Sequence, residues 1–387
     1  MLGREVVIVS AARTPVGRGH PEKGYYKDTH PADLLAASYN EVVSRAGIGA
    51  AEVEIAIAGC VQQLGEQSFN IARNAWLQAG LPIETSAFTL DLQCGSSQQA
   101  VGLASALIAS GVHDVVVAGG VEHMGHISFA AGEDVARQYG SPYTDTLLER
   151  YEIVGQALGA EMIGDKWDIS RTEMDEFAVR SHALAHQATE AGKLKREMVP
   201  MEIGGQDISV DQGIRPTTTM ETLGALKPVF KADGKITAGT SSQISDGAAA
   251  VLLMTPEKAK ELGLTPRARI IDQTSVGCDP ITMLEGPIPA TAKILERNGM
   301  GIGDIDLFEV NEAFAPVVIA WSREHNPDMD RVNTRGGAIA IGHPLGSTGA
   351  RLITSLVHTL EDEDKQTGLV TMCVGGGVGT ATLIERI

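Results

Sequence analysis

Short runs of consecutive apolar residues alternate with longer segments of helical spacing through the first 120 residues. Apolar runs bounded by Gly and Pro predict buried strands, and apolar residues three and four apart predict helices. The predicted strands are residues 6–9, 55–59, 88–92 and 115–120, and the predicted helices are residues 32–47, 70–79 and 100–110. Because strands and helices alternate through short turns, we predict a parallel α/β layered sandwich.

The pattern changes after Gly120. Residues 122–240 contain loops with His and Met, a charged segment of helical spacing at 171–190 and a polar loop at 211–219. A strand-like run at 248–254 then restores the earlier pattern. We therefore predict an N-terminal half (residues 1–120 and 245–265), an inserted loop domain (121–244) and a C-terminal half (266–387).

The two predicted halves repeat one order of elements. Residues 42–57 predict the end of a helix, a Gly turn, an acidic-apolar step and a strand, and residues 294–310 predict the same series. In each half a turn of small residues later enters a long helix, after Cys94 and after His343. The repeated order indicates a duplicated α/β unit. If the halves face each other, the Cys94 turn and the His343 loop converge.

Charge and cysteine usage narrow the classes of function. The chain has 387 residues and a net charge of −18, which argues against binding to nucleic acid or an anionic membrane, since both need a basic surface. No stretch has the length of a membrane span or the pattern of a signal peptide, so we expect a cytoplasmic protein. The four cysteines lie far apart without a CxxC pair, so a disulfide framework is not expected.

Cys94 follows a predicted strand and precedes Gly95 and a predicted helix. A thiol there faces backbone N–H groups and the positive end of the helix dipole, which predicts a lowered pKa. The thiol could therefore be a nucleophile that awaits a base, and the same N–H groups could receive an oxyanion. The alternative is a buried cysteine in a tight turn.

Three further residues could complete such a site. His343 lies in a loop of small residues and is either the base for Cys94 or a loop or capping histidine. Cys373 enters the glycine-rich run 374–379, which predicts a catalytic turn, a phosphate cradle or merely a tight turn. Asn311 follows a predicted strand, where ligands bind in α/β sheets, or it caps the next helix.

The sequence gives little support for a metal-binding site. A zinc site built from the cysteines and His343 lacks the spacing of zinc ligands. His123 and His126 are three residues apart, and loop packing explains them better than metal binding. We predict no metal site.

Six motifs follow one another along the chain: CGSS from Cys94, GGVEHMGH from Gly119, TAGTSSQISDGAA from Thr237, NEAF from Asn311, GGAIAIGHPLGSTGAR from Gly336 and CVGGGVG from Cys373. Together they resemble the motifs of the thiolase family, the acetyl-CoA acetyltransferases and 3-ketoacyl-CoA thiolases. The resemblance extends over the whole chain in family order. It implies an α/β fold of two similar αβαβα layered-sandwich halves with a loop domain inserted in the first.

The resemblance also implies a mechanism. Cys94 would carry the acyl group as a thioester, His343 would activate it, and Cys373 would be the acid/base that moves protons. A water held by Asn311 would form one oxyanion hole with His343, and the backbone N–H groups of Cys94 and Gly375 would form the other. The implied reaction is ping-pong thiolysis of a 3-oxoacyl-CoA, with coenzyme A as co-substrate and no tightly bound cofactor.

A set of contacts with coenzyme A follows from the same resemblance. Arg215 would meet the charged nucleotide end, and His123 would lie near the pantetheine. The implied adenine and pantetheine wall is Thr222, Leu226, Val229, Phe230 and Ser242, and the implied acyl end is Met283, Ala313 and Phe314.

The sequence leaves the substrate and the partners open. The residues around Cys94 (91–93 and 98–99) and the segment 211–215 resemble thiolases of unusual acyl-CoAs, including steroid-derived ones. The loop 122–126 and the helix 169–186 resemble ordinary β-oxidation thiolases instead. A biosynthetic acetyl-CoA acetyltransferase and a non-catalytic acyl-CoA-binding subunit are the alternatives. The expected partners are copies of the chain, in a homodimer or homotetramer. Whether a β-oxidation hydratase/dehydrogenase subunit also binds is left open by the sequence.

Overall fold

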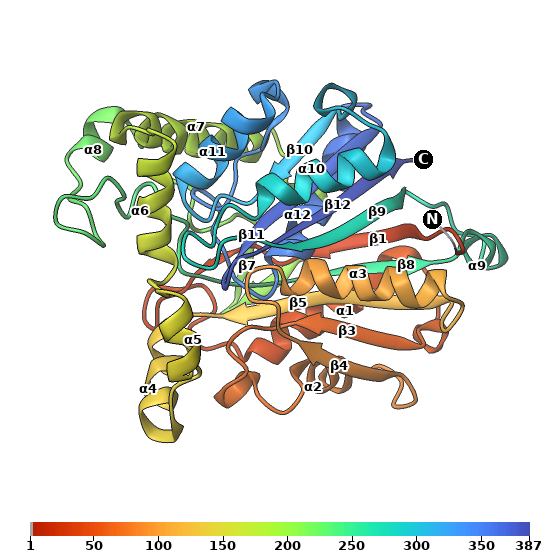
Figure 1. Ribbon diagram of the computed structural model, residues 1–387. Helices are drawn as coiled ribbons and strands as arrows, with labels where there is room; N and C mark the ends of the chain where they lie inside the picture. Colours follow the sequence, from red (N-terminus) through yellow and green to blue (C-terminus); the bar gives the residue numbers. More distant parts are fainter. Residues whose placement is uncertain (1–2) are drawn as a thin grey trace.

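Ten strands form one large sheet in the computed structural model, which describes residues 3–387 (Figure 1). Along the sheet the order is β10-β11-β12-β9-β1-β8-β5-β3-β4, and the short β2 pairs with β8. The N-terminal strands are β1 (Val7–Arg13), β2 (Gly17–Arg18), β3 (Ile55–Gly59), β4 (Ser86–Leu90), β5 (Val115–His123) and β8 (Ser245–Met254). The C-terminal strands are β9 (Ala268–Gly277), β10 (Leu307–Val310), β11 (Thr367–Val374) and β12 (Val378–Arg386). β1 and β9 join these two groups through two residue pairs, Val7 with Arg269 and Ile8 with Ala268.

The sheet is mixed, so the prediction of a parallel sandwich was wrong for its centre. Among the described strands, β3 runs parallel to β4 and β5, and β10 runs parallel to β11. β11 and β12 pair antiparallel because the turn at residues 375–377 is too short for the crossover that parallel neighbours need. β8 follows the insertion instead of a crossover helix, and it pairs antiparallel with β1 and β5.

Helices lie on both outer faces of the sheet and between its two groups of strands (Figure 1). The middle layer is α3 (Ser96–Ala109) and α12 (Thr348–Asp362), whose apolar residues form one core with strands of both groups. On the N-terminal side, α1 (Pro31–Ala46) and α2 (Ile71–Gln78) cover the outer face. On the C-terminal side, α10 (Pro287–Asn298) and α11 (Ala315–His325) do the same. Five layers result, with α9 (Pro256–Glu261) in the connection between the halves.

The predicted repeat is confirmed. α1, η1 (Ala50–Glu52) and β3 follow one another in the same order as α10, η4 (Ile302–Asp304) and β10. Both helices end at a glycine in the left-handed conformation, Gly47 with φ 72° and Gly299 with φ 63°. Glycine adopts this conformation without strain, which explains why both helices end there.

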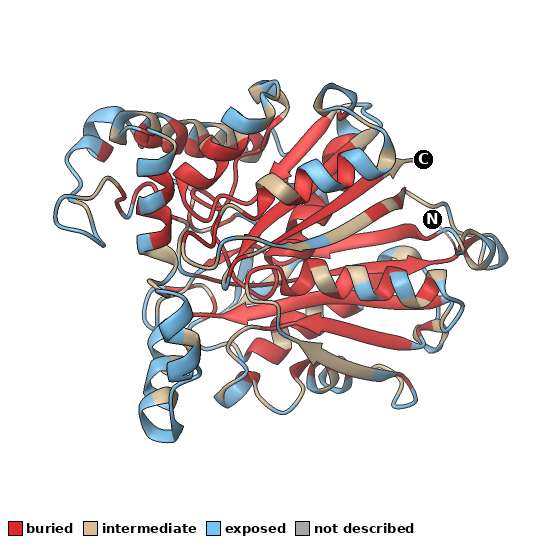
Figure 2. Cartoon of the chain, in the orientation of Figure 1, coloured by how far each residue is buried: buried red, intermediate tan, exposed pale blue. Residues whose placement is uncertain are grey.

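The insertion between β5 and β8 places most of its helices at one end of the sheet (Figure 1). Its elements are α4 (Phe129–Tyr139), α5 (Asp145–Arg150), α6 (Gln156–Lys166), α7 (Arg171–Glu190), η3 (Lys195–Glu197), β6 (Met201–Ile203), β7 (Gln206–Ile208) and α8 (Met220–Gly224). α4 and α5 project from the rest and carry no buried residue (Figure 2). The remaining short helices are η2 (Gly65–Gln67) and η5 (Met329–Arg331).

A buried ion cluster connects the insertion to β1. Arg13 Nε donates to Glu197 Oε1 at 2.6 Å, and its Nη1 and Nη2 donate to the two oxygens of Asp211 at 2.7 and 2.9 Å. All three side chains are at most 1% exposed. Burial acts to lower the pKa of Arg13, but the two carboxylates raise it on balance. The guanidinium is therefore permanently charged. Loss of either carboxylate would leave part of this buried charge uncompensated.

Candidate active site

Cys94 lies in the turn between β4 and α3. The preceding residue, Gln93, has a left-handed φ of 46°, which is uncommon for a residue other than glycine. Ser96 Oγ donates to the Gln93 carbonyl at 2.6 Å and accepts from Leu92 N at 2.9 Å. Gly95 is the N-cap of α3. These contacts hold the turn and place Cys94 directly before the helix.

The Cys94 thiol is 1% exposed, and burial raises its pKa to about 12. The backbone N–H groups of Gly375 and of Cys94 itself act in the opposite direction. The predicted lowering of the pKa was therefore wrong, because the loss of hydration outweighs the N–H groups at the start of the helix. Cys94 is a neutral thiol at neutral pH and needs a base before it can attack.

β11 and the turn after it bring two more predicted residues to Cys94. Cys373 is fully buried, and its pKa is raised well above the usual value, first by burial and then by the neighbouring Cys94. Gly375 directs its N–H toward the Cys94 thiol. The two thiols and the Gly375 amide therefore share one buried site, although they come from different halves.

His343 lies in the loop that precedes α12 and is 3% exposed. Its Nε2 is 3.3 Å from Asn311 Nδ2, and its Nδ1 is 2.7 Å from Thr348 Oγ1. Burial, and then the charge of Arg351, lowers the pKa of His343 to about 3. The imidazole is therefore neutral and able to accept a proton. Asn311 Oδ1 is buried and has no hydrogen-bond partner among residues 3–387.

Contacts that sequence reasoning missed hold the loop before α12 and the first turn of α12 against the N-terminal half. Gly346 N donates to Glu122 Oε2, and Ala350 N donates to Ser97 Oγ on α3, both at 2.9 Å. A Cβ on Gly120 would lie 2.0 Å from the Gly346 carbonyl oxygen, so β5 and the loop approach each other as closely as glycine allows. Each contact is non-local, and single residues in the sequence carry no signal of it.

The residues predicted to bind coenzyme A form two groups. One group is exposed or half-buried, around α8 and before β8: Thr222, Leu226, Val229, Phe230 and Ser242. The other is buried, in the turn after β9 and before α11: Met283, Ala313 and Phe314. The rings of Phe230 and Phe314 meet edge to face with centroids 6.1 Å apart, and Ser242 N donates to Ala313 O at 2.9 Å. The structure thus brings the two groups together.

Arg215 is exposed, and its backbone N donates to His182 Nδ1 at 3.1 Å. Partial burial lowers the pKa of Arg215, and so does the charge of Arg18. Arg18 is a neighbour that sequence reasoning missed. Within residues 3–387 neither guanidinium forms an ion pair with a carboxylate. Two such cations in one place favour an anionic ligand.

His123, which the resemblance placed near the pantetheine, is the last residue of β5 and is buried. It is 0% exposed; its Nε2 is 2.9 Å from the Tyr26 carbonyl oxygen and its Nδ1 accepts from His126 N at 3.1 Å. Burial lowers the pKa of His123 to about 4. Both ring nitrogens therefore contact other groups of the protein, which holds the imidazole in place.

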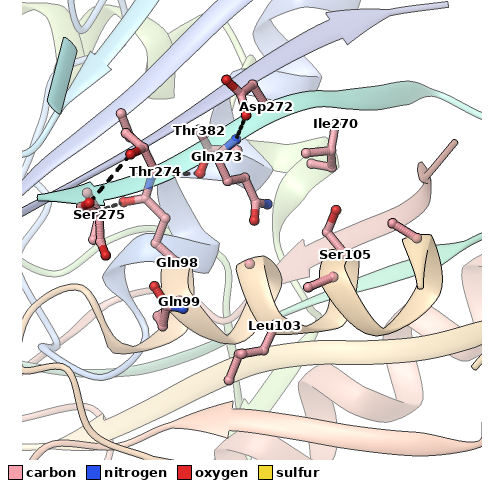
Figure 3. A pocket seen from close by; sticks show the side chains of 15 residues that line it. Gln98, Gln99, Leu103, Ser105, Ile270, Asp272, Gln273, Thr274, Ser275 and Thr382 are labelled. Atoms are coloured by element: carbon pink, nitrogen blue, oxygen red, sulfur yellow. Dashed lines mark hydrogen bonds between the residues drawn. The ribbon is translucent and has the colours of Figure 1, made fainter. Parts of the chain in front are cut away.

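A cavity of about 300 Å³ lies between α3 and the strands β9 and β12 (Figure 3). Gln98, Gln99 and Leu103 of α3 border it opposite Gln273 and Thr382. The predicted catalytic and coenzyme A residues are absent from its lining, so it is separate from the Cys94 site.

Among residues 3–387, no three His, Cys, Asp or Glu side chains lie close enough together to hold a metal ion. In the same range no helix is long and apolar enough to span a membrane.

The fold and the site define an enzyme of two duplicated halves, in which a buried thiol from each half shares one site. A buried, neutral histidine precedes the central helix α12. The profile of the thiolase N-terminal domain matches residues 6–257, and that of the thiolase C-terminal domain matches residues 264–386. The chain therefore belongs to the thiolase family, as its motifs predicted.

Relatives and solved structures agree with this assignment. The chain is 44% identical to a steroid 3-ketoacyl-CoA thiolase of Mycobacterium tuberculosis, over 99% of this chain and 94% of the relative. It is 46% identical to a 3-ketoacyl-CoA thiolase of Aeromonas hydrophila, over 99% and 100%. The crystal structure of the Bacillus anthracis acetyl-CoA acetyltransferase matches with a TM-score of 0.90 at 37% identity, and that of human mitochondrial 3-ketoacyl-CoA thiolase with 0.90 at 35%. Both matches cover 100% of each chain, which confirms the predicted fold.

Proposed function

We propose that this chain is a degradative thiolase, which cleaves a 3-oxoacyl-CoA with coenzyme A through a thioester on Cys94. The observation that carries the proposal is the buried meeting of Cys94, Cys373 and the Gly375 amide, together with a neutral His343 held against Asn311. Relatives named 3-ketoacyl-CoA thiolases, at 44–46% identity over almost the whole chain, support it.

The first half-reaction forms the thioester. His343 takes the proton of the Cys94 thiol as the sulfur attacks the 3-oxo carbon, and the N–H groups of Cys94 and Gly375 stabilise the oxyanion. The bond between C2 and C3 then breaks, and its electron pair becomes the enolate of acetyl-CoA. Cys373 gives its proton to that carbon, which releases acetyl-CoA.

Asn311 and His343 would stabilise the enolate oxygen. The buried and unpartnered Oδ1 of Asn311 supports the proposed role of this amide in holding a water there. In the second half-reaction Cys373 takes the proton of the CoA thiol, which attacks the thioester. The shortened acyl-CoA leaves and the Cys94 sulfur recovers its proton from His343, so both thiols return to their starting state.

Coenzyme A would bind across the inserted domain (121–244) and the start of α11. Arg215 and Arg18 are suited to its phosphate groups, and the exposed apolar residues around Phe230 are suited to adenine and pantetheine. We assign no tightly bound cofactor. The proposed form is a cytoplasmic homodimer or homotetramer, alone or with a β-oxidation hydratase/dehydrogenase subunit, which light scattering and co-purification can distinguish.

A panel of 3-oxoacyl-CoAs, from acetoacetyl to long-chain and steroid side-chain thioesters, tests the proposal. Wild type should consume CoA and release acetyl-CoA, and mass spectrometry should find the acyl group on Cys94. Cys94→Ala should lose both signals, whereas Cys373→Ala should still be acylated by an acyl-CoA and should fail in C–C cleavage. Cys60→Ala serves as a control for cysteine removal. Cleavage of no panel member by folded wild type would refute the proposal.

A biosynthetic acetyl-CoA acetyltransferase is the second candidate. The likeness to the Bacillus anthracis acetyl-CoA acetyltransferase favours it. Cleavage restricted to acetoacetyl-CoA would support this candidate, while preference for long or steroid-derived chains would support the degradative function.

A further inference from the structure

Thr348, the first residue of α12, contacts the imidazole of His343 at the ring nitrogen that does not face Asn311. Its Oγ1 is 2.7 Å from His343 Nδ1 and 2.8 Å from the carbonyl oxygen of Pro344. All of these groups are buried. A carbonyl oxygen can only accept, so the hydroxyl hydrogen points to Pro344 and a lone pair of Oγ1 faces the ring. The hydrogen of the neutral imidazole therefore belongs on Nδ1.

The contact at the other ring nitrogen agrees with this assignment. Asn311 Nδ2 lies 3.3 Å from His343 Nε2, and an amide nitrogen can only donate. A lone pair on Nε2 accepts from this amide when the hydrogen is on Nδ1. Two partners from different elements thus select the same one of the two neutral forms of the ring.

We propose that Thr348 is a positioning residue that holds His343 in the form with the hydrogen on Nδ1, so that Nε2 is the proton acceptor. The proposal rests on the thiolase function proposed above. It assigns a role to a residue other than the cysteines, the histidine and the asparagine of the proposed mechanism. When His343 takes the proton of Cys94, its Nδ1–H becomes a charged donor and the bond to Thr348 strengthens. Thr348 therefore acts more on the acylation transition state than on the bound substrate.

Three variants separate this role from helix stability. Thr348→Val removes the hydroxyl and keeps the shape, and Thr348→Ser restores the hydroxyl. Thr354→Val is the matched control, because the Thr354 hydroxyl also is buried in α12 and donates four residues back, to Ala350 O at 2.8 Å, without touching a histidine. The difference between the two valine variants isolates the contact with Nδ1.

Kinetics give the first readout. Thr348→Val should lower kcat for thiolysis on the order of 10- to 100-fold with KM nearly unchanged, as expected when the partner that orients a functional histidine is lost. Thr348→Ser should recover most of the rate, and Thr354→Val should stay close to wild type. Equal losses in both valine variants, or a loss in KM alone, would overturn the positioning role.

Nitrogen-15 NMR of the imidazoles gives a second readout that needs no activity. The His343 signals are assigned by their absence in His343→Gln. Wild type should carry the hydrogen on Nδ1, and Thr348→Val should shift the population toward Nε2–H. A wild-type ring with its hydrogen on Nε2 would refute the inference even if the protein is a thiolase. Conversely, failure of wild type to cleave any 3-oxoacyl-CoA would refute the proposed function and leave the NMR result to decide the tautomer.

Discussion

Replacing Gly349 with alanine should destabilise the protein, although the same exchange inside a helix normally stabilises it by about 1 kcal/mol. A Cβ on Gly349 would lie 2.3 Å from the backbone N of Gln98 and 2.6 Å from its Cβ. Since non-bonded atoms pack at about 3.5 Å, α12 and α3 would have to separate by about 1 Å. The backbone of Gln98 cannot rotate away, and its side chain is held by Val370 O and Thr382 Oγ1.

The magnitude follows from two opposing terms. Overpacking of a core costs about 1–3 kcal/mol, and we take the upper value because the clash is with backbone. Subtracting the gain in helix propensity of about 1 kcal/mol leaves a net loss of about 2 kcal/mol. For 387 residues, at about 2.1 cal/mol/K of unfolding entropy per residue, this lowers Tm by about 2–3 °C. Activity should fall more, up to about 100-fold, because α3 follows Cys94, α12 follows His343, and a 1 Å displacement spoils their alignment.

Urea denaturation and thiolysis kinetics of three alanine variants test this reasoning. At Gly224, in α8, an added Cβ meets nothing within 4 Å, so Gly224→Ala should be neutral or slightly stabilising. At Gly164 the added atom meets the flexible end of Met174 at 2.9 Å, so the effect should be intermediate. Gly349→Ala with the stability and activity of wild type would refute the inferred contact between the two central helices.

Two further predictions concern buried charge. Asp211→Asn leaves the Arg13 guanidinium with Glu197 alone and should cost about 3 kcal/mol in urea denaturation; a loss below about 1 kcal/mol would contradict the role of the ion cluster. Burial, and then the charge of Arg267, lowers the pKa of His358 to about 4, so this group contributes stability above pH 6.5 that is lost as the pH falls toward 4. Between pH 6.5 and pH 4 the free energy of unfolding of wild type should therefore fall by about 3 kcal/mol more than that of His358→Gln. Equal losses in the two proteins would show that His358 is not a buried neutral base.

Local signals predicted the elements of the two halves well. The helix predicted at 32–47 is α1 (Pro31–Ala46), and the charged segment 171–190 is α7 (Arg171–Glu190), whose start is a capping box of Ser170 and Glu173. The strand predicted at 88–92 is β4 (Ser86–Leu90), two residues earlier, because the apolar run continues into the Cys94 turn. Periodicity and caps are properties of neighbouring residues, so the sequence contains them.

Features that depend on distant residues could not be predicted from patterns. The antiparallel centre of the sheet and the approach of Arg18 to Arg215 both join separate elements. The pKa of Cys94 was predicted in the wrong direction for the same reason. The helix start is visible in the sequence, whereas the burial that dominates is produced by packing of the whole molecule.

The position of β12 has a consequence for the order of folding. This strand, Val378–Arg386, lies between β11 and β9, so neither neighbour can complete its hydrogen bonding until the chain has been synthesised through β12. The same step closes the turn that carries Gly375 beside Cys94. Until then the nascent protein exposes strand edges and the apolar faces of its central helices, a condition that favours aggregation and makes folding slow. The environment of the Cys94 thiol is therefore complete only once β12 has joined the sheet.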